Sequence, residues 1–155
     1  KGEQVCLKND ANSIVIRTSW LYSSFGKNFV KTMIDLMKKN KSVKVVNDQI
    51  GSPTCAYDLT KVIIEIIMNS KIESGLFHYS NEGEISWFEF ARSIRELYKL
   101  DCEIIGVSSK EFKTLTKRPK YSLLNKSKIK TTFNLEIPNY KQSLEDCIEI
   151  IKNEA

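Results

Sequence analysis

The sequence predicts an α/β fold, because short strand-type segments alternate with longer segments of helical periodicity. Residues 13–17 (SIVIR) form a β-branched apolar run of the kind found in buried strands. Residues 26–40 then place their apolar side chains at helical spacing. A second alternation follows, from the apolar helical segment 58–68 to the strand-type segment 75–80 (GLFHYS). This order favours a sheet covered by helices over a helical bundle.

The first third of the chain contains three further signals. Residues 1–9 (KGEQVCLKN) resemble the last turns of a helix, which the turn-rich segment NDANS ends. Residues 43–46 contain three valines and predict a second strand. The segment NDQIGSPT then supplies a Gly-Ser-Pro loop, and Thr54 is predicted to be the N-cap of the helix over 58–68.

The second half of the chain begins with a clear helix start. Residues 86–89 match the Ser-x-x-Glu capping box, so a helix is predicted from there to about Leu100, with the two aromatic residues of the motif in the core. Residues 102–108 (CEIIGVS) predict a strand. Residues 108–111 repeat the capping-box spacing and predict a short helical turn. An amphipathic helix over 143–152 closes the chain.

The composition is that of an ordinary globular protein, with 155 residues, 41% hydrophobic residues and 28% charged residues. No apolar run approaches the roughly 20 residues needed to span a membrane. A net charge of +5 raises the question of nucleic acid, but the lysines are spread along the chain without interleaved stacking aromatics. We therefore expect neither a nucleic-acid nor a membrane partner. The modest positive excess suits a small anionic ligand such as a nucleotide diphosphate.

The cysteines argue against a metal site and against a disulfide framework. Four are scattered without a Cys-x-x-Cys pair, and the chain has one histidine. We expect reduced thiols in a cytoplasmic protein and no bound metal.

The sequence lacks the turn that binds dinucleotides in many α/β enzymes. Its six glycines lie too far apart to form G-x-G-x-x-G. Because the chain also opens within a helix, we expect part of the fold to lie outside these 155 residues.

Four segments, in this order, resemble the C-terminal part of the dTDP-4-dehydrorhamnose reductases, a family of extended short-chain dehydrogenases/reductases. They are RTSWLYSSFGKNFVKTM, VVNDQIGSPTCAYDLT, GLFHYSNEGEISWFEFA and RPKYSLLNKSKI. The resemblance implies the C-terminal part of an NAD(P)-binding Rossmann-type reductase, with the last sheet strands and the small α/β substrate-binding domain. Residues 1–19 and 55–80 would be the tail of the cofactor domain, and residues 20–54 and 81–155 the sugar-nucleotide domain.

The activity that this resemblance implies is the reduction of dTDP-4-dehydro-L-rhamnose to dTDP-L-rhamnose, with NADPH or NADH as cofactor. Lys1-Gly2-Glu3 resembles the end of a KL-x-GE segment that follows the family's catalytic Tyr-x-x-x-Lys pair. The catalytic pair and the Gly-rich turn would then lie outside this chain, which alone is expected to be inactive. Some members bind a metal between subunits through a glutamate where this chain has Tyr57-Asp58, so metal-linked dimerisation is not implied. A monomer and a homodimer both stay open.

The resemblance assigns substrate and cofactor contacts near the end of the first strand. Trp20 follows residues 13–18 and would lie at the carboxyl end of a parallel strand, where open α/β sheets bind their ligands. The resemblance implies that Trp20 packs against the deoxysugar and that Thr18 and Ser19 lie near the nicotinamide. The alternative is that Trp20 is a core residue between two domains.

Three polar residues are further candidates for substrate binding. Asn28 opens a helix whose free N–H groups can meet an anion or a sugar oxygen. Gln49 and Ser52 flank Gly51 in the Gly-Ser-Pro loop, where the alternative is turn chemistry around Pro53.

Arg118 is the candidate for phosphate or sugar contact. It precedes a proline in a basic segment with Lys117 and Lys120. The alternative is a solvated run of charges.

Two other functions stay open. One is a non-catalytic relative that acts as a regulatory binding subunit, as the β subunit of methionine adenosyltransferase does. The other is a reductase of a different nucleotide sugar, since no residue here identifies thymine.

Overall fold

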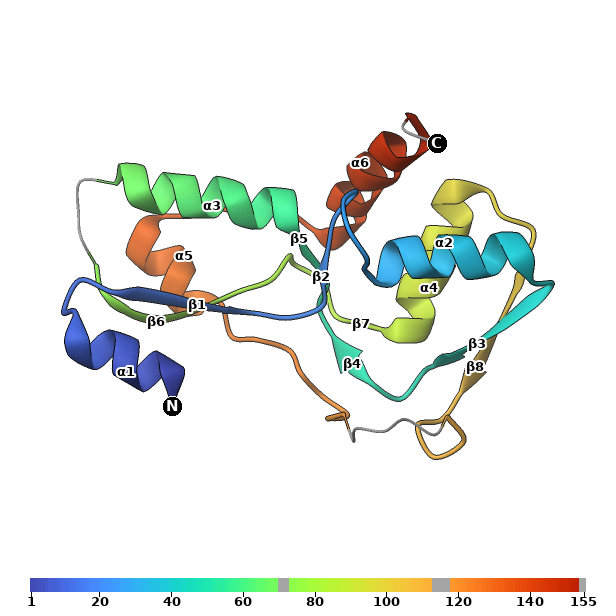
Figure 1. Cartoon of the computed structure of the whole chain (residues 1–155), viewed down its shortest axis with the longest axis horizontal. Helices are drawn as coiled ribbons and strands as arrows, with labels where there is room; N and C mark the ends of the chain where they lie inside the picture. The colour runs from blue at the N-terminus through green and yellow to red at the C-terminus, as the bar shows by residue number, and fades with distance from the viewer. Residues whose placement is uncertain (70–72, 113–117, 154–155) are drawn as a thin grey trace.

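The computed structural model describes residues 1–69, 73–112 and 118–153. They form two adjoining groups of helices and short strands (Figure 1). The first group contains α1 (Gly2–Asn9), β1 (Ile14–Thr18), α3 (Ala56–Met68), β6 (Gly75–Tyr79) and α5 (Ser127–Phe133). The second contains α2 (Phe29–Lys39), β3 (Ser42–Val46), α4 (Trp87–Tyr98), β8 (Glu103–Val107) and α6 (Tyr140–Asn153). Four two-residue strands lie between these longer elements: β2 (Leu21–Tyr22), β4 (Ile50–Gly51), β5 (Thr54–Cys55) and β7 (Ile85–Ser86).

The strands of the described residues form four separate two-stranded ladders. β1 pairs with β6 in parallel, with Ile14 opposite Gly75, and β3 pairs with β8 in parallel, with Ser42 opposite Glu103. β2 and β5 form a short parallel pair, whereas β4 and β7 are antiparallel. The parallel ladders and the helices that accompany them confirm the predicted α/β class.

The first hydrophobic core lies where α3 and α5 meet β6. Val62 and Ile66 of α3 pack with Phe77 of β6 and with Ile129 and Phe133 of α5. On β1, Arg17 donates two hydrogen bonds to the carboxylate of Glu3, which holds α1 against the strand. The resemblance assigns residues 81–155 to the sugar-nucleotide domain, and α5 from this range packs in the first core. The division of the chain into two domains stays a prediction.

The second core is organised by aromatic rings beneath α2, α4 and α6. Phe90 of α4 is fully buried. Its ring stacks on Phe29 of α2 at 5.7 Å and meets the edges of Tyr22 and Tyr140 at 5.5 and 6.3 Å. These contacts join three helices to β2.

The longest predicted elements are confirmed. The strands expected at 13–17 and 75–80 are β1 and β6, and the helices expected at 26–40 and 86–100 are α2 and α4. The capping box is complete, since the N–H of Glu89 donates to the hydroxyl of Ser86 at 3.1 Å and the N–H of Ser86 donates to the Glu89 carboxylate at 2.7 Å.

Three local predictions need correction. Thr54 does not cap α3, because it lies in β5 and its hydroxyl donates instead to the carbonyl of Ser19 at 2.6 Å. Residues 108–111 form a hydrogen-bonded turn without a helix, although the hydroxyl of Ser108 does donate to Glu111 at 2.6 Å. The last helix begins at Tyr140, one turn earlier than predicted.

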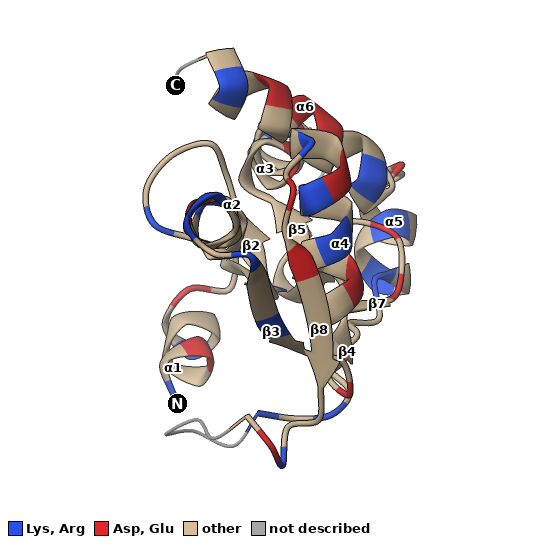
Figure 2. Cartoon of the chain, turned by 90° about the vertical axis from the view of Figure 1, so that its right-hand side faces the viewer, with Lys and Arg blue, Asp and Glu red and all other residues tan. Residues whose placement is uncertain are grey.

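Charges of both signs are mixed on the outer helices. On the face that Figure 2 presents, both basic and acidic residues occur on α4 and α6. Arg92 and Glu96, one turn apart on α4, form an ion pair at 3.6 Å. Within the described ranges, no helix combines the length and the apolar character needed to cross a membrane.

The two faces of α3 differ sharply in exposure, which gives a test of the first core. Ile66 is 7% exposed and packs in that core, whereas the neighbouring Ile67 is 72% exposed. We predict that Ile66→Ala lowers the free energy of unfolding of the 155-residue chain by about 2–5 kcal/mol. The control Ile67→Ala should change it by less than about 0.5 kcal/mol. Urea titration measures both, and equal losses would contradict the placement of α3.

Candidate functional site

Trp20, between β1 and β2, has a strained backbone. Its φ is +49°, in the left-handed region that bulky residues avoid. The other non-glycine residues with positive φ in the described ranges, Lys99 and Asn134, lie at helix C-caps, where this conformation is common. Trp20 ends no helix. Backbone strain of this kind persists only where surrounding contacts enforce it.

The indole of Trp20 stacks on that of Trp87, the first residue of α4. The ring centroids are 3.6 Å apart and the planes are inclined by 13°. These are the two tryptophans of the sequence. Phe29 supports Trp87 from α2, with its ring centroid at 4.5 Å. The stack therefore connects the end of β1 to the second core.

Gly51, the last residue of β4, lies close to the indole of Trp20. A Cβ added at Gly51 would lie 2.8 Å from two atoms of the Trp20 ring and 2.7 Å from the hydroxyl oxygen of Ser122. Both distances are well inside van der Waals contact. Glycine at position 51 is therefore required by the close approach of the backbone to Trp20.

Backbone hydrogen bonds bring the segment that contains Arg118 close to β4 and to the indole of Trp20. The N–H of Ile50 donates to the carbonyl of Lys120 at 2.8 Å, and the N–H of Ser122 donates to the carbonyl of Ile50 at 2.9 Å. These bonds align residues 120–122 with β4 and place Arg118 and Pro119 beside it. Arg118 is exposed. Lys117, which the sequence grouped with it, lies outside the described residues.

These segments enclose a small pocket of about 170 Å³. Two indoles form its apolar wall, and an amide and a guanidinium supply hydrogen-bond donors. Its lining residues are Ser19, Trp20, Gln49, Trp87, Arg118, Pro119 and Ser122. Pockets for whole drug-sized ligands are typically about 300–1,000 Å³, so this one holds a part of a ligand, such as one ring.

Hydrogen bonds between Asp48 and Ser109 hold the turn that contains Gln49. Asp48 accepts hydrogen bonds from the hydroxyl of Ser109 at 2.7 Å and from its N–H at 2.9 Å. The hydrogen bond from that hydroxyl lowers the pKa of the Asp48 carboxyl. The bonds fix the backbone next to Gln49.

Four of the sequence-predicted residues meet in this pocket: Ser19, Trp20, Gln49 and Arg118. The other three do not line it. The hydroxyl of Thr18 donates to the hydroxyl oxygen of Thr54 at 3.0 Å. Ser52 is fully buried and donates to the carbonyl of Asn81 at 2.5 Å.

Asn28 is engaged as a helix cap. Its side-chain oxygen accepts from the N–H of Lys31 at 3.2 Å, and its amide nitrogen donates to the carbonyl of Ser23 at 2.8 Å. Its assignment to the substrate stays a prediction.

Sequence reasoning missed three lining residues, Trp87, Pro119 and Ser122. Trp87 was predicted as core because it lies inside a capping box, and the stack with Trp20 joins positions far apart in the chain. Ser122 lies in the segment RPKYSLLN, which carries part of the family resemblance, and that membership is the one signal in the sequence that could have pointed to it.

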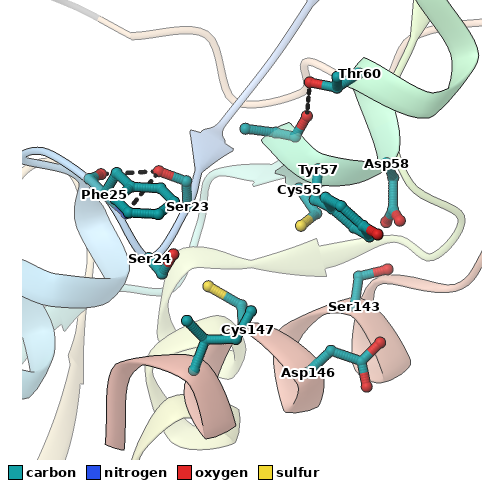
Figure 3. A pocket seen from close by; sticks show the side chains of 12 residues that line it. Ser23, Ser24, Phe25, Cys55, Tyr57, Asp58, Thr60, Ser143, Asp146 and Cys147 are labelled. Carbon is teal, nitrogen blue, oxygen red and sulfur yellow. Dashed lines mark hydrogen bonds between the residues drawn. The ribbon is translucent and has the colours of Figure 1, made fainter. Parts of the chain in front are cut away.

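A larger pocket of about 510 Å³ lies elsewhere, between the loop at 23–25, the start of α3 and α6 (Figure 3). None of the sequence-predicted site residues lines it. Burial raises the pKa of the Cys147 thiol in its wall to about 12, so this thiol is protonated at neutral pH and is a poor nucleophile. The four cysteines are unpaired. The described residues contain no cluster of three or more His, Cys, Asp or Glu that could hold a metal ion.

The spacing Tyr-x-x-x-Lys does occur within this chain, at Tyr57 and Lys61 of α3. The ammonium of Lys61 lies over the face of the Tyr57 ring, 4.3 Å from its centroid. Tyr57 is 68% exposed and borders the larger pocket. The pair therefore lies apart from the pocket that contains Trp20.

Comparison with known proteins gives a family match over nearly the whole chain. The model of the RmlD substrate binding domain family matches residues 1–153. The spore coat polysaccharide biosynthesis protein SpsK of Bacillus subtilis is 40% identical over 80% of this chain and 43% of that protein. A dTDP-4-dehydrorhamnose reductase of Sinorhizobium fredii is 36% identical over 92% of this chain and 51% of that protein.

Solved structures agree with this match. The crystal structure of dTDP-4-dehydrorhamnose reductase from Bacillus anthracis, in complex with NADP, aligns with a TM-score of 0.88 and 38% identity. The alignment covers 96% of this chain and 52% of that one. The chain thus spans about half the length of the curated relatives it matches.

The close approach of Gly51 to Trp20 can be tested by adding one methyl group. We predict that Gly51→Ala lowers the free energy of unfolding by about 1–3 kcal/mol, because the loop or the indole must move. The matched control is Gly2→Ala, where the space around the new Cβ is open and the change should be neutral or slightly stabilising. Urea unfolding followed by tryptophan fluorescence measures both variants. A Gly51→Ala variant as stable as the control would refute the contact.

Proposed function

Because the chain belongs to the RmlD substrate binding domain family, we propose that it is the sugar-nucleotide-binding portion of a dTDP-4-dehydrorhamnose reductase. The observation that carries this proposal is the family match over residues 1–153, together with one pocket that unites Trp20, Gln49 and Arg118. The whole enzyme would reduce dTDP-4-dehydro-L-rhamnose to dTDP-L-rhamnose with NADPH or NADH. The name of the Bacillus subtilis relative supports a role in polysaccharide biosynthesis.

The cofactor would be held mainly outside this chain. Thr18 and Ser19 end a strand that pairs in parallel with β6, and hydroxyl groups at the carboxyl end of such a strand fit the polar edge of a nicotinamide. When bound, the nicotinamide supplies a hydride to the sugar carbonyl carbon. The part of this chain in the reaction is positioning, which can supply much of a rate enhancement.

Trp20 would orient the sugar. The apolar face of a deoxysugar ring suits an indole, and the stack on Trp87 keeps that indole from rotating. The amide of Gln49 lines the same pocket and can bond to a sugar hydroxyl. Ser52 and Asn28 would contribute through the loops that they fix rather than from the pocket wall.

Arg118 would bind the diphosphate. A guanidinium can hold two phosphate oxygens at once, which an ammonium cannot copy. Pro119 restricts the backbone beside it, so less conformational entropy is lost when the side chain is fixed.

The remaining surfaces suit the missing half of such an enzyme. Within the described residues β1 pairs only with β6, and Ile64, Ile67 and Met68 leave apolar surface exposed on α3. Parallel sheets in α/β proteins are usually covered on both faces. We therefore assign residues 1–19 and 55–80 to the tail of a cofactor domain in a cytoplasmic enzyme, monomeric or homodimeric.

An assay of the full-length protein tests the proposal. We expect oxidation of NADPH or NADH with dTDP-4-dehydro-L-rhamnose in a panel of 4-keto nucleotide sugars, and no turnover with the 155-residue chain alone. A preference for another nucleotide sugar would correct the substrate. A full-length protein that is inactive throughout the panel would favour the regulatory binding subunit.

Trp20→Ala should impair the sugar's orientation while the fold persists. In the full-length reductase we expect kcat/KM to fall by about 10- to 100-fold, with turnover lowered as well as KM raised. The control Phe25→Ala removes a 72% exposed aromatic ring that borders the larger pocket, and it should leave the kinetics unchanged. A collapse of the melting temperature in Trp20→Ala, without a kinetic defect in the folded enzyme, would return Trp20 to the core.

Arg118→Ala should weaken binding of dTDP by about 10- to 100-fold, as expected for the loss of charged hydrogen bonds worth about 1.5–3 kcal/mol. Arg118→Lys should recover only part of this affinity. Lys120→Ala is the control, since its backbone carbonyl, which is retained, makes the structural bond to Ile50. Calorimetric titration of the four full-length proteins measures the effect. Equal affinities would assign Arg118 to a solvated run of charges.

A further inference from the structure

We infer that Asn81 is a positioning residue for the Trp20 pocket. It holds the loop at 51–54, and that loop holds Trp20 in its left-handed conformation against Trp87. Neither Asn81 nor Trp87 was a candidate from the sequence.

The side chain of Asn81 is fully buried just beyond β6, and every polar atom on it is bonded. Its oxygen accepts from the N–H of Cys55 at 2.7 Å. Its amide nitrogen donates to the carboxylate of Asp58 at 2.7 Å, to the hydroxyl of Ser143 at 3.0 Å and to the carbonyl of Pro138 at 3.3 Å. One amide thus joins the start of α3 to α6 and to the segment before α6.

The backbone of Asn81 forms hydrogen bonds directly to the loop at 51–54. Its N–H donates to the carbonyl of Pro53 at 3.1 Å, and its carbonyl accepts from the hydroxyl of Ser52 at 2.5 Å. The same carbonyl accepts from the ammonium of Lys126 at 3.0 Å. Ser52 is fully buried, so no water can replace its bond if the hydroxyl is removed.

The loop in turn forms hydrogen bonds to the segment that contains Trp20. The hydroxyl of Ser19 donates to the carbonyl of Ser52 at 3.1 Å, and the hydroxyl of Thr54 donates to the carbonyl of Ser19 at 2.6 Å. The N–H of Thr54 donates to the carbonyl of Trp20 itself at 3.2 Å. Gly51 closes against the indole. One set of hydrogen bonds therefore joins Asn81 to the loop, and a second set joins the loop to Ser19 and Trp20.

A positive φ makes Trp20 sensitive to these bonds. A left-handed conformation is unfavourable for a bulky residue, so Trp20 relaxes to a common conformation once the loop no longer enforces it. Relaxation turns the side chain about the backbone and takes the indole off Trp87. The consequence for ligand affinity rests on the proposed function, but the geometric consequence does not.

Nuclear magnetic resonance and circular dichroism of the 155-residue chain measure the geometry without any ligand. Two indoles stacked at 3.6 Å give nuclear Overhauser contacts between their ring protons, and their coupled transitions give a paired positive and negative band when the transition dipoles are skewed; the chain has no other tryptophan. Trp20→Phe should abolish this couplet and so assign it. Well below the melting temperature, Ser52→Ala and Asn81→Ala should lose most of the couplet. Ser93→Ala should keep it, because its hydroxyl also donates to a carbonyl, at 3.1 Å, but lies outside this network on α4.

The same variants can be titrated with dTDP-L-rhamnose, whose sugar is the part that Trp20 would contact. We expect Ser52→Ala to bind it about 10-fold more weakly than the parent, and Ser93→Ala to bind it equally. A couplet or an indole–indole nuclear Overhauser contact at full strength in folded Ser52→Ala, or the absence of both from the parent chain, would overturn the inference. If Asn81→Ala does not fold, Ser52→Ala decides. A parent chain that shows the couplet, loses it in Ser52→Ala and binds no dTDP-L-rhamnose would support the positioning role while contradicting the proposed function.

Discussion

The buried amide of Asn81 lies where the two hydrophobic cores of this chain adjoin, and in the part of the chain that the structure describes no continuous sheet runs between them. The described strands form separate two-stranded ladders, so backbone pairing alone cannot fix one core against the other. Asn81 bonds instead to the loop at 51–54, the start of α3 and α6. In a buried network, removing one partner leaves others unsatisfied at about 1–3 kcal/mol each. A complete network therefore defines one arrangement, whereas an incomplete one is strongly disfavoured.

The candidate site is a consequence of that arrangement. The end of β1, the loop at 51–54 and the segment at 118–122 converge because hydrogen bonds tie each to the next, and Gly51 permits contact between backbone and indole. The result is a small pocket with an aromatic wall and a guanidinium at its edge. Such a pocket can orient a ligand. The larger pocket has the greater volume, but two aspartates and no lysine or arginine line it, so it lacks a cationic side chain that could bind a phosphate.

The sequence predicted those features whose signals are local. The helical spacing of α2, the capping box of α4 and the apolar run of β1 each lie within a few consecutive residues, and all three elements formed as expected. The two-residue strands were missed because long-range pairing rather than periodicity defines them. The helix α5 was missed because its seven residues are too few to show a clear helical period. Thr54 illustrates the same limit: its type suits an N-cap, but the carbonyl of Ser19, distant in sequence, takes its hydroxyl. Trp20 and Arg118 were found through a family resemblance, whereas their meeting in one pocket, and the role of Trp87 beneath Trp20, required the fold.

The central claim is that the pocket lined by Trp20, Trp87 and Arg118 receives the sugar nucleotide. Nuclear magnetic resonance tests it most directly, because the 155-residue chain gives two indole N–H resonances, one for each tryptophan. Titration with dTDP-L-rhamnose should shift both indole signals, together with the backbone signals of residues 49–51, and leave those of Tyr57 and Cys147 in place. Shifts confined to Tyr57, Cys147 and their neighbours, with both indole signals unmoved at saturation, would contradict the account.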